Sequence, residues 1–466
     1  MADILIWQWI LVIGSSVILY LISPLAKNKS NFFSGLSAKD AQPGFWMLTS
    51  SLVISWLFAK SITNAANLGL SFGIVGGLAY AMYYFSFLVA GVIIYQMRKN
   101  GGFKSLHHFL QSKFGRGAMA LFSLVISIRL LNEVWSNAAV IGTYFGETGS
   151  GQYIAAVLVF TGLTLAYSLK GGLRSSLITD MIQMALFGVL LFVILSVILP
   201  AKGDVSSFVT SGEWTMATGL NLFFVAMIQV FSYPFHDPVL TDRGFISDEK
   251  TTLKSFIAAT VIGFLCITLF SFVGIYGKFI GVSGQAAVEV SKTLGVGMML
   301  VMNFIMITSA ASTLDSTFSS VSKMAVVDWV QDRLNVDFSV SRGRWVMAIT
   351  AIGGLIPLLF APEIISATTV SGTMVLGLAP IFIFWKMPAP KISYHLSIWT
   401  GIFAGVALAL GWVPESLFFT TGKYADLLAV NIYGTLISFA GYLIPAFVFQ
   451  STSEKAVFSK SSQESL

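Results

Sequence analysis

Five ionisable residues lie inside long apolar stretches of this sequence: Lys60, Arg129, Glu133, Asp180 and Asp315. A charge within a membrane-spanning segment is costly, so it usually faces a cavity, a partner or an ion pathway. Arg129 and Glu133 are four residues apart, which places both on one helix face and allows an internal ion pair. Asp180 follows a glycine pair closely and could instead cap a helix near the membrane interface. The five charges predict ion pairing or ion binding inside a membrane.

Two of the apolar stretches turn polar partway across, which indicates interrupted helices. The segment 56–64 carries Lys60 with a serine, a threonine and an asparagine. Such a segment suits unwound backbone whose carbonyls can coordinate a ligand. The segment 229–238 contains two prolines among polar residues, and each proline removes a helical hydrogen bond. We expect the two breaks to line the binding site.

A third polar segment, 308–317, offers hydroxyl groups at adjacent positions together with the carboxylate of Asp315. Hard oxygen ligands of this kind suit an alkali cation. Hydroxyls and small residues also serve helix packing in membranes, which would explain this segment except for its carboxylate. The segment is therefore a candidate cation site.

The elements that position these residues are membrane-spanning helices. The chain has 466 residues, of which 56% are hydrophobic and 10% are charged, whereas soluble domains carry roughly a quarter charged residues. This composition excludes a soluble enzyme, and the single Cys266 excludes an internal disulfide. At about 20 apolar residues per span, we predict an all-α membrane protein with about thirteen transmembrane helices. These lie near 4–23, 45–70, 73–97, 117–145, 151–169, 176–199, 215–235, 254–279, 292–320, 345–360, 365–385, 395–412 and 428–450.

Most basic residues, including Arg243, fall in the predicted loops on one side of these spans. This asymmetry explains the net charge of +6 without a nucleic-acid partner. The positive-inside rule then places the N-terminus outside a cell membrane and the C-terminus in the cytoplasm.

The predicted spans divide the chain into five parts. Each of two central blocks holds five spans, and this odd number makes the second block inverted relative to the first. The parts are an extra transmembrane helix with a cytoplasmic loop (1–44), a first repeat (45–199), a second repeat (215–385), two C-terminal transmembrane helices (386–450) and a cytoplasmic tail (451–466).

The segment 170–183 resembles a signature of the sodium:solute symporter family. It has a Gly-Gly-Leu turn at 171–173, followed by Thr179, Asp180 and Gln183. The segment 237–243 resembles more loosely that family's polar segment, which ends in an arginine after the sixth core helix. The resemblance covers nearly the whole chain and implies a LeuT-like core of 5+5 inverted repeats with cation-driven uptake.

The resemblance also implies two sodium sites and a substrate site. The first sodium site would use backbone carbonyls of Ala59, Ile62 and Ser309 and hydroxyls of Ser312 and Thr313. The second, present in some family members, would use Asp180, Asp315 and Ser316. The substrate would lie between the broken helices, near Lys60, Ser61, Thr63, Asn64, Tyr83, Gln229, Ser232 and Tyr233.

Lys60 departs from the family pattern, which has an uncharged residue there. Its ammonium would repel a sodium ion 4 Å away by about 4 kcal/mol at an effective dielectric constant of 20. Three interpretations are open: Lys60 pairs with Asp315 or Asp180, meets an anionic group of the substrate, or replaces the ion with a titrating proton. We favour the pair with Asp315, because that residue is the other unusual charge and lies on the helix expected to face Lys60.

Together these features predict a secondary active transporter that takes up a small polar organic solute with sodium. An amino acid such as proline is the first expectation, since Lys60 could accept a carboxylate. The alternatives are a proton-coupled or urea-type symporter, a channel and a transporter-like membrane sensor. Because the four histidines show no metal-ligand spacing with carboxylates, we expect no enzyme and no metal other than Na⁺. We also expect no organic cofactor, with H⁺ as the alternative coupling ion and the solute and the lipid bilayer as partners.

Overall fold

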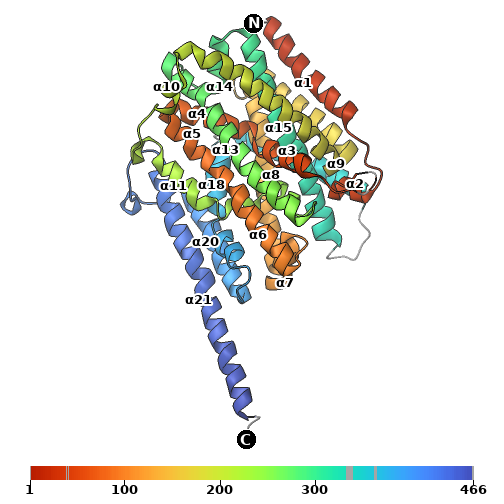
Figure 1. Cartoon of the computed structure of the whole chain (residues 1–466), viewed down its shortest axis with the longest axis vertical. Coiled ribbons are helices and arrows are strands. Elements are labelled where there is room, and N and C mark those ends of the chain that lie inside the picture. The colour runs from red at the N-terminus through yellow and green to blue at the C-terminus, as the bar shows by residue number, and fades with distance from the viewer. Residues whose placement is uncertain (1, 38, 40, 332–338, 361–364, 464–466) are drawn as a thin grey trace.

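The computed structural model describes residues 2–37, 39, 41–331, 339–360 and 365–463, and within them all regular secondary structure is helical. Figure 1 shows the arrangement of the helices. The first half contains α1 (Ala2–Ile22), α2 (Lys29–Ser34), α3 (Phe45–Trp56), α4 (Ala59–Phe72), α5 (Ile74–Ala81), α6 (Ser86–Gly101), α7 (Leu106–Phe114), α8 (Arg116–Thr143) and α9 (Gly151–Ile198). The second half contains α10 (Val205–Val209), α11 (Leu220–Gln229), α12 (Pro238–Arg243), α13 (Glu249–Ile280), α14 (Ala286–Thr293), α15 (Val296–Lys323), α17 (Val340–Leu355), α18 (Ser366–Met374), α19 (Leu378–Ile383), α20 (Lys391–Ala409) and α21 (Ala425–Gln463).

The predicted all-α membrane fold is confirmed. Among the described residues, nine helices are long and apolar enough to cross a membrane, and the bent pair of α3 and α4 makes ten. The helix α9 has 48 residues, more than twice the length that one crossing needs, and Gly172 with its φ of 56° divides it into two arms. The shorter helices α11, α18 and α19 fall within two further predicted spans, 215–235 and 365–385, whereas α12 follows the first of these. The count of thirteen spans remains a prediction.

Both predicted interruptions are present in the structure. The helices α3 and α4 meet at Leu57–Phe58 and are bent by 59°. After α11 the chain passes through a short 3₁₀-helix, η4 (Tyr233–His236), before α12 begins. Pro234 and Pro238 stand at the starts of η4 and α12, because a proline has no N–H with which to continue a preceding helix.

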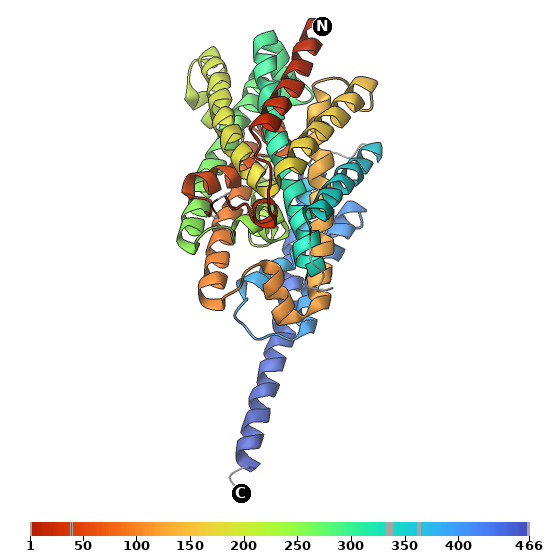
Figure 2. The same cartoon turned by 90° about the vertical axis from the view of Figure 1, so that its right-hand side faces the viewer.

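The helices form one bundle in which the two interrupted segments are enclosed. The helix α13 packs against α3, α4, α5 and α6, and α15 packs against α8, α9 and α17. The N-terminus lies at one end of the long axis, and α21 extends beyond the bundle at the other end (Figures 1 and 2).

Two glycines allow α13 to approach α4 closely. A Cβ atom added at Gly274 would overlap the backbone carbonyl of Ala66, and one added at Gly69 would overlap the carbonyl of Ser271. Small residues at such contacts let helix backbones pack directly within a membrane. The position of the first interrupted helix therefore depends on this contact.

Replacing Gly274 with alanine should push α13 away from α4 and lower the free energy of unfolding by about 1–3 kcal/mol. Thermal unfolding of the purified protein in detergent measures the loss. The matched control is Gly188→Ala on α9, where no atom lies within 4 Å of the added Cβ. Equal melting temperatures for the two variants would contradict the close contact.

Candidate functional site

The first interruption leaves two backbone groups that bond to other helices instead of to each other. The Trp56 carbonyl accepts a hydrogen bond from Tyr84 Oη at 2.6 Å, and the Lys60 amide donates to Asn137 Oδ1 at 3.2 Å. In a continuous α-helix this carbonyl and this amide would form one i→i+4 bond. Since buried backbone groups need partners, Tyr84 and Asn137 stabilise the break.

Four charged residues beside this break form a chain of ion pairs, the charge quartet: Lys60 on α4, Arg129 and Glu133 on α8, and Asp237 at the N-terminus of α12. Lys60 pairs with Glu133, and Arg129 pairs with both Glu133 and Asp237, the latter at 3.2 Å. Each side chain is at most 1% exposed. Two cations and two carboxylates balance, and this pairing offsets the cost of removing the charges from water.

The expected pair of Lys60 with Asp315 or Asp180 is wrong, because Glu133 is the partner of Lys60. The predicted pair of Arg129 and Glu133 is confirmed. Lys60 and Glu133 are 73 positions apart, so no local spacing in the sequence reveals their contact. It results from the packing of α4 against α8.

A second buried network, the Asp180 network, contains an arginine that the sequence did not place there. Arg243 Nη2 donates to Asp180 Oδ2 at 3.1 Å and to Ser316 Oγ at 2.7 Å, and Arg243 Nε donates to Ser51 Oγ at 2.6 Å. The side chains of Asp180 and Arg243 are fully buried. The assignment of Arg243 to a cytoplasmic loop is therefore wrong, because α12 packs against α3 and α15. The alternative of a helix cap for Asp180 is also wrong, because every hydrogen bond that its carboxylate accepts from the described residues comes from a side chain and none from a backbone N–H.

Asp315 belongs to the same network. Its Oδ1 accepts from Ser176 Oγ and its Oδ2 accepts from Thr179 Oγ1, both at 2.8 Å. The Oγ atoms of Ser176 and Ser316 lie 2.9 Å apart and connect this carboxylate to the group around Arg243. The structure therefore brings together Asp180, Asp315 and Ser316, the predicted ligands of a second cation. Arg243 supplies one positive charge to two carboxylates, which leaves one negative charge when both are ionised.

The predicted first sodium site lies between α4 and α15, which pack against each other. Ala59 and Ile62 occupy the first turn of α4, directly after the break. On α15, Thr313 Oγ1 donates to the Ser309 carbonyl at 2.9 Å, and Ser312 Oγ donates to Asp180. The Ser309 hydroxyl is buried without a hydrogen-bond partner among the described residues. The predicted ligands are hard oxygen atoms of the kind that suits an alkali cation, and the Ser309 hydroxyl, which the prediction did not include, is a further unpartnered oxygen beside them.

Five of the eight predicted substrate residues, namely Ser61, Asn64, Tyr83, Gln229 and Ser232, fall into two hydrogen-bonded groups. In the first group, Ser61 Oγ lies 3.2 Å from Tyr80 Oη, and Asn64 Nδ2 donates to the same hydroxyl at 3.3 Å. In the second, Tyr83 Oη donates to Gln229 Oε1 at 2.9 Å.

The side chain of Gln229 forms its hydrogen bonds with residues outside the two breaks. Its Nε2 donates to Asn431 Oδ1 at 2.8 Å and to Thr373 Oγ1 at 3.3 Å, and Ser232 Oγ donates to its carbonyl. Gln229 and Ser232 thus have partners within the bundle. Thr63 is buried on α4, and no hydrogen bond connects its side chain to either group.

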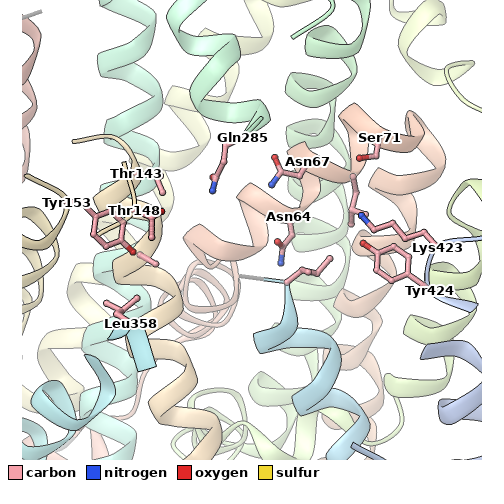
Figure 3. Close-up of a pocket in the computed structure, with 13 residues that line it drawn as sticks. Asn64, Asn67, Ser71, Thr143, Thr148, Tyr153, Gln285, Leu358, Lys423 and Tyr424 are labelled. Atoms are coloured by element: carbon pink, nitrogen blue, oxygen red, sulfur yellow. The ribbon is translucent and has the colours of Figure 1, made fainter. Parts of the chain in front are cut away.

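In the described part of the chain, two of the cavities lie along α4. The outer one, which we call the vestibule, has a volume of about 310 Å³, and the residues drawn in Figure 3 line it. Asn64 and Asn67 of α4 lie on one side of it, and Thr143, Thr148 and Tyr153 lie on the other (Figure 3). The inner one, which we call the aromatic pocket, measures only about 10 Å³. Its walls are Trp56, Phe58, Ser61, Tyr80, Tyr83, Tyr84, Tyr233 and Thr368.

Several residues of these sites were missed by the sequence predictions. Tyr80 and Tyr84 flank the predicted Tyr83 on one helix face, and this i, i+4 spacing was the available signal. Trp56 and Phe58 adjoin the break and could have been added for that reason. Thr368 enters from α18, and no sequence signal links it to the site.

Comparisons with known proteins place the chain by fold. No protein-family model and no curated protein sequence matches it. A Na⁺-coupled sialic acid symporter in its substrate-bound outward-open state matches with a TM-score of 0.72 and 14% identity, over 95% of this chain and 97% of that one. Mhp1, a nucleobase-cation-symport-1 family transporter, matches in its inward-facing conformation (TM-score 0.56, 13% identity, 92% and 96% covered). It also matches in a closed conformation with bromovinylhydantoin bound (TM-score 0.57, 13% identity, 91% and 96% covered). The chain therefore has the LeuT-like fold of multi-pass membrane transporters.

Proposed function

We propose that this protein is a secondary active symporter of the sodium:solute symporter type, which couples uptake of a small polar organic solute to sodium. The observation that carries the proposal is the meeting of two interrupted helices beside hard-oxygen groups of α15, within this transporter fold. Half-helix ends and broken helices at the repeat interface are where such transporters bind substrate and ions. The proposed setting is a cell membrane, with the N-terminus outside and the C-terminus in the cytoplasm.

In the proposed mechanism a sodium ion joins α4 to α15 through the Ala59, Ile62 and Ser309 carbonyls and the Ser312 and Thr313 hydroxyls. This contact holds the first interrupted helix in place while the solute binds between the two breaks. Loss of sodium to the cytoplasm loosens the contact and allows release of the solute. One charge moving down the membrane potential supplies about 2.3 kcal/mol per 100 mV, which supports uptake against a gradient.

The coupling ion and the solute are separate parts of the proposal. Asp315 offers a route to proton coupling, because its network has one negative charge more than Arg243 balances. The argument for proline was that Lys60 could accept its carboxylate. This argument no longer holds, because Lys60 pairs with Glu133. Urea remains an alternative solute.

Uptake into proteoliposomes tests the symport proposal. Solute uptake or counterflow is measured with an inward sodium gradient, with an inward proton gradient and with neither. Uptake driven by the sodium gradient supports the proposal. Uptake driven only by the proton gradient would show that H⁺ and not Na⁺ is the coupling ion. Uptake that responds to neither gradient would contradict symport and favour a channel or a facilitator, and binding without any uptake would favour a sensor.

Thr313→Ala should raise the sodium concentration needed for half-maximal uptake by about ten- to a hundredfold. This range follows from losing one polar contact to a charged group, about 1.5–3 kcal/mol. The matched control is Thr260→Ala on α13, since Thr260 is also buried and its hydroxyl also donates to the carbonyl four residues earlier. An unchanged sodium dependence in Thr313→Ala would exclude this hydroxyl as a ligand.

A further inference from the structure

We propose that the solute is an uncharged molecule with a flat ring and only two or three polar atoms, such as a small heterocycle. This proposal rests on the proposed transport function, because it names the substrate class of the same site. Three features of the aromatic pocket support it: the composition of its walls, the pairing of the charges behind it and the small number of its available polar groups.

The walls of the aromatic pocket are mostly rings. Six of its eight residues are aromatic, and each of the eight is at most 3% exposed. Phe58 comes from the first break and Tyr233 from the second, so the pocket lies where both interrupted helices meet. Trp56 and Tyr83 have ring centroids 5.8 Å and 5.4 Å from that of Tyr233. A ring placed offset-stacked or edge-to-face against these walls would gain about 0.5–1.5 kcal/mol per aromatic pair beyond its buried area.

The charges nearest the pocket are already paired. Lys60 Nζ and the Arg129 guanidinium lie 4.9 Å and 5.4 Å from the centroid of the Phe58 ring, and neither residue lines the pocket. Both cations are neutralised within the charge quartet. A carboxylate in the pocket would therefore lose its water without gaining an unpaired cation, and such a loss is costly.

An amino acid fits this pocket poorly. Its ammonium group would need a free carboxylate, whereas Glu133 and Asp237 are engaged by Lys60 and Arg129. Without an unpaired cation its carboxylate would depend on the N-terminus of α4, where Asn137 already holds the Lys60 amide. Lys423 lines the vestibule and not the aromatic pocket, so it can meet a solute on entry but cannot pair with it inside.

Few polar groups remain for the solute. Tyr84 Oη is engaged by the Trp56 carbonyl and Tyr83 Oη by Gln229. The other hydroxyl-bearing walls are Ser61, Tyr80, Tyr233 and Thr368. Tyr80 Oη lies 3.2 Å from Ser61 Oγ and 3.3 Å from Thr368 Oγ1. A sugar carries five or six polar groups, and every buried one left without a partner weakens binding. The pocket therefore suits a ring with few polar atoms.

Tyr80 also separates this pocket from the vestibule. Its hydroxyl contacts Ser61 and Asn64 of α4 and Thr368 of α18, and Asn64 lines the vestibule. Since the aromatic pocket holds about 10 Å³, the rings must move apart before a solute can enter. Entry from the vestibule replaces the Tyr80 contacts with contacts to the solute.

The test is a thermal-shift screen of the purified full-length protein in detergent, in sodium chloride and in choline chloride. The probes are hydantoin, uracil and hypoxanthine as flat neutral heterocycles, against L-proline, D-glucose and urea. We expect at least one heterocycle to raise the melting temperature in a concentration-dependent way. No shift with any heterocycle, or a shift only with proline, glucose or urea, would overturn the proposal.

The failures of this proposal and of the proposed function are distinguishable. A heterocycle that binds but is not taken up by proteoliposomes under a sodium or a proton gradient contradicts symport and supports the substrate class. Gradient-driven uptake of proline, glucose or urea, without binding of a heterocycle, supports symport and overturns the class.

Variants of the pocket residues test whether the heterocycle binds in the aromatic pocket. Phe58→Leu and Tyr233→Leu should each weaken binding of the heterocycle about tenfold, whereas Phe208→Leu, at a buried ring on α10, should not. Tyr80→Phe keeps the ring and should weaken binding about 2- to 10-fold, against a control of Tyr394→Phe, whose hydroxyl donates to the Ala118 carbonyl. Equal affinity in all these variants would place the heterocycle elsewhere.

Discussion

Replacing Arg243 with glutamine should lower the free energy of unfolding by about 3–5 kcal/mol, the usual cost of removing one partner from a buried ion pair. The variant leaves Asp180 and Asp315 in one network without a fixed cation. Each carboxylate keeps hydroxyl partners, but their mutual repulsion is no longer offset. Chemical or thermal unfolding in detergent measures the loss.

A double variant separates the charge effect from a simple packing defect. Asp180→Asn together with Arg243→Gln removes one charge of each sign, so it should be more stable than Arg243→Gln alone. The two residues are in contact, and coupling of about 0.5–3 kcal/mol is typical of such pairs. A double variant as unstable as the sum of the two single variants would contradict the ion pair.

Sodium should stabilise Arg243→Gln more than it stabilises the unmodified protein. The variant has two uncompensated carboxylates, and a ligand that binds only the folded state raises its stability. The comparison is the melting temperature in sodium chloride against choline chloride. Arg344→Gln is the control, because Arg344 is partly buried and donates to the Leu169 carbonyl, so its loss leaves no carboxylate of the Asp180 network unpaired. An equal sodium effect in both variants would exclude Arg243 as the fixed cation of that network.

The second large effect is expected at the charge quartet, where Glu133→Gln should destabilise the protein more than Lys60→Met. Glu133 pairs with both Lys60 and Arg129 and also accepts from Asn137 Nδ2 at 2.9 Å. Its loss leaves two buried cations with one carboxylate, at a cost of about 3–5 kcal/mol. Lys60→Met leaves Glu133 with Arg129 as a partner and fills the space with an apolar chain.

Combining Lys60→Met with Glu133→Gln should recover part of the stability that Glu133→Gln loses. The double variant retains one ion pair, Arg129 with Asp237, and has no excess charge. Thermal unfolding of the two single variants and the double variant gives their order of stability. The control is Lys292→Met, which removes an exposed pair with Glu289 and should cost at most about 1 kcal/mol. If Lys60→Met were the more damaging change, Lys60 would have a role beyond neutralising Glu133.

The sequence by itself determined the features that depend on local composition. Apolar length identified the membrane helices, because a bilayer requires about 20 apolar residues per crossing. Two prolines after Gln229 located the second interruption, because a proline cannot continue a preceding helix. The polar residues around Lys60 located the first only approximately, since the break is at Leu57–Phe58 and the polar residues from Lys60 to Asn64 are helical in α4. The i, i+4 spacing identified the pair of Arg129 and Glu133, because residues four apart are neighbours on any helix. Each of these predictions needed only neighbouring residues.

Only the tertiary structure decided which distant groups meet. Lys60 faces Glu133 and not Asp315, because α4 packs on α8 at that level, and no spacing in the chain encodes this register. Arg243 is buried and not a loop charge, because the short helix α12 lies against α3 and α15. The aromatic pocket gathers rings from both breaks with Thr368 of α18. Contacts between residues far apart in sequence arise from how helices pack, and this packing gave the candidate site its charge balance and its shape.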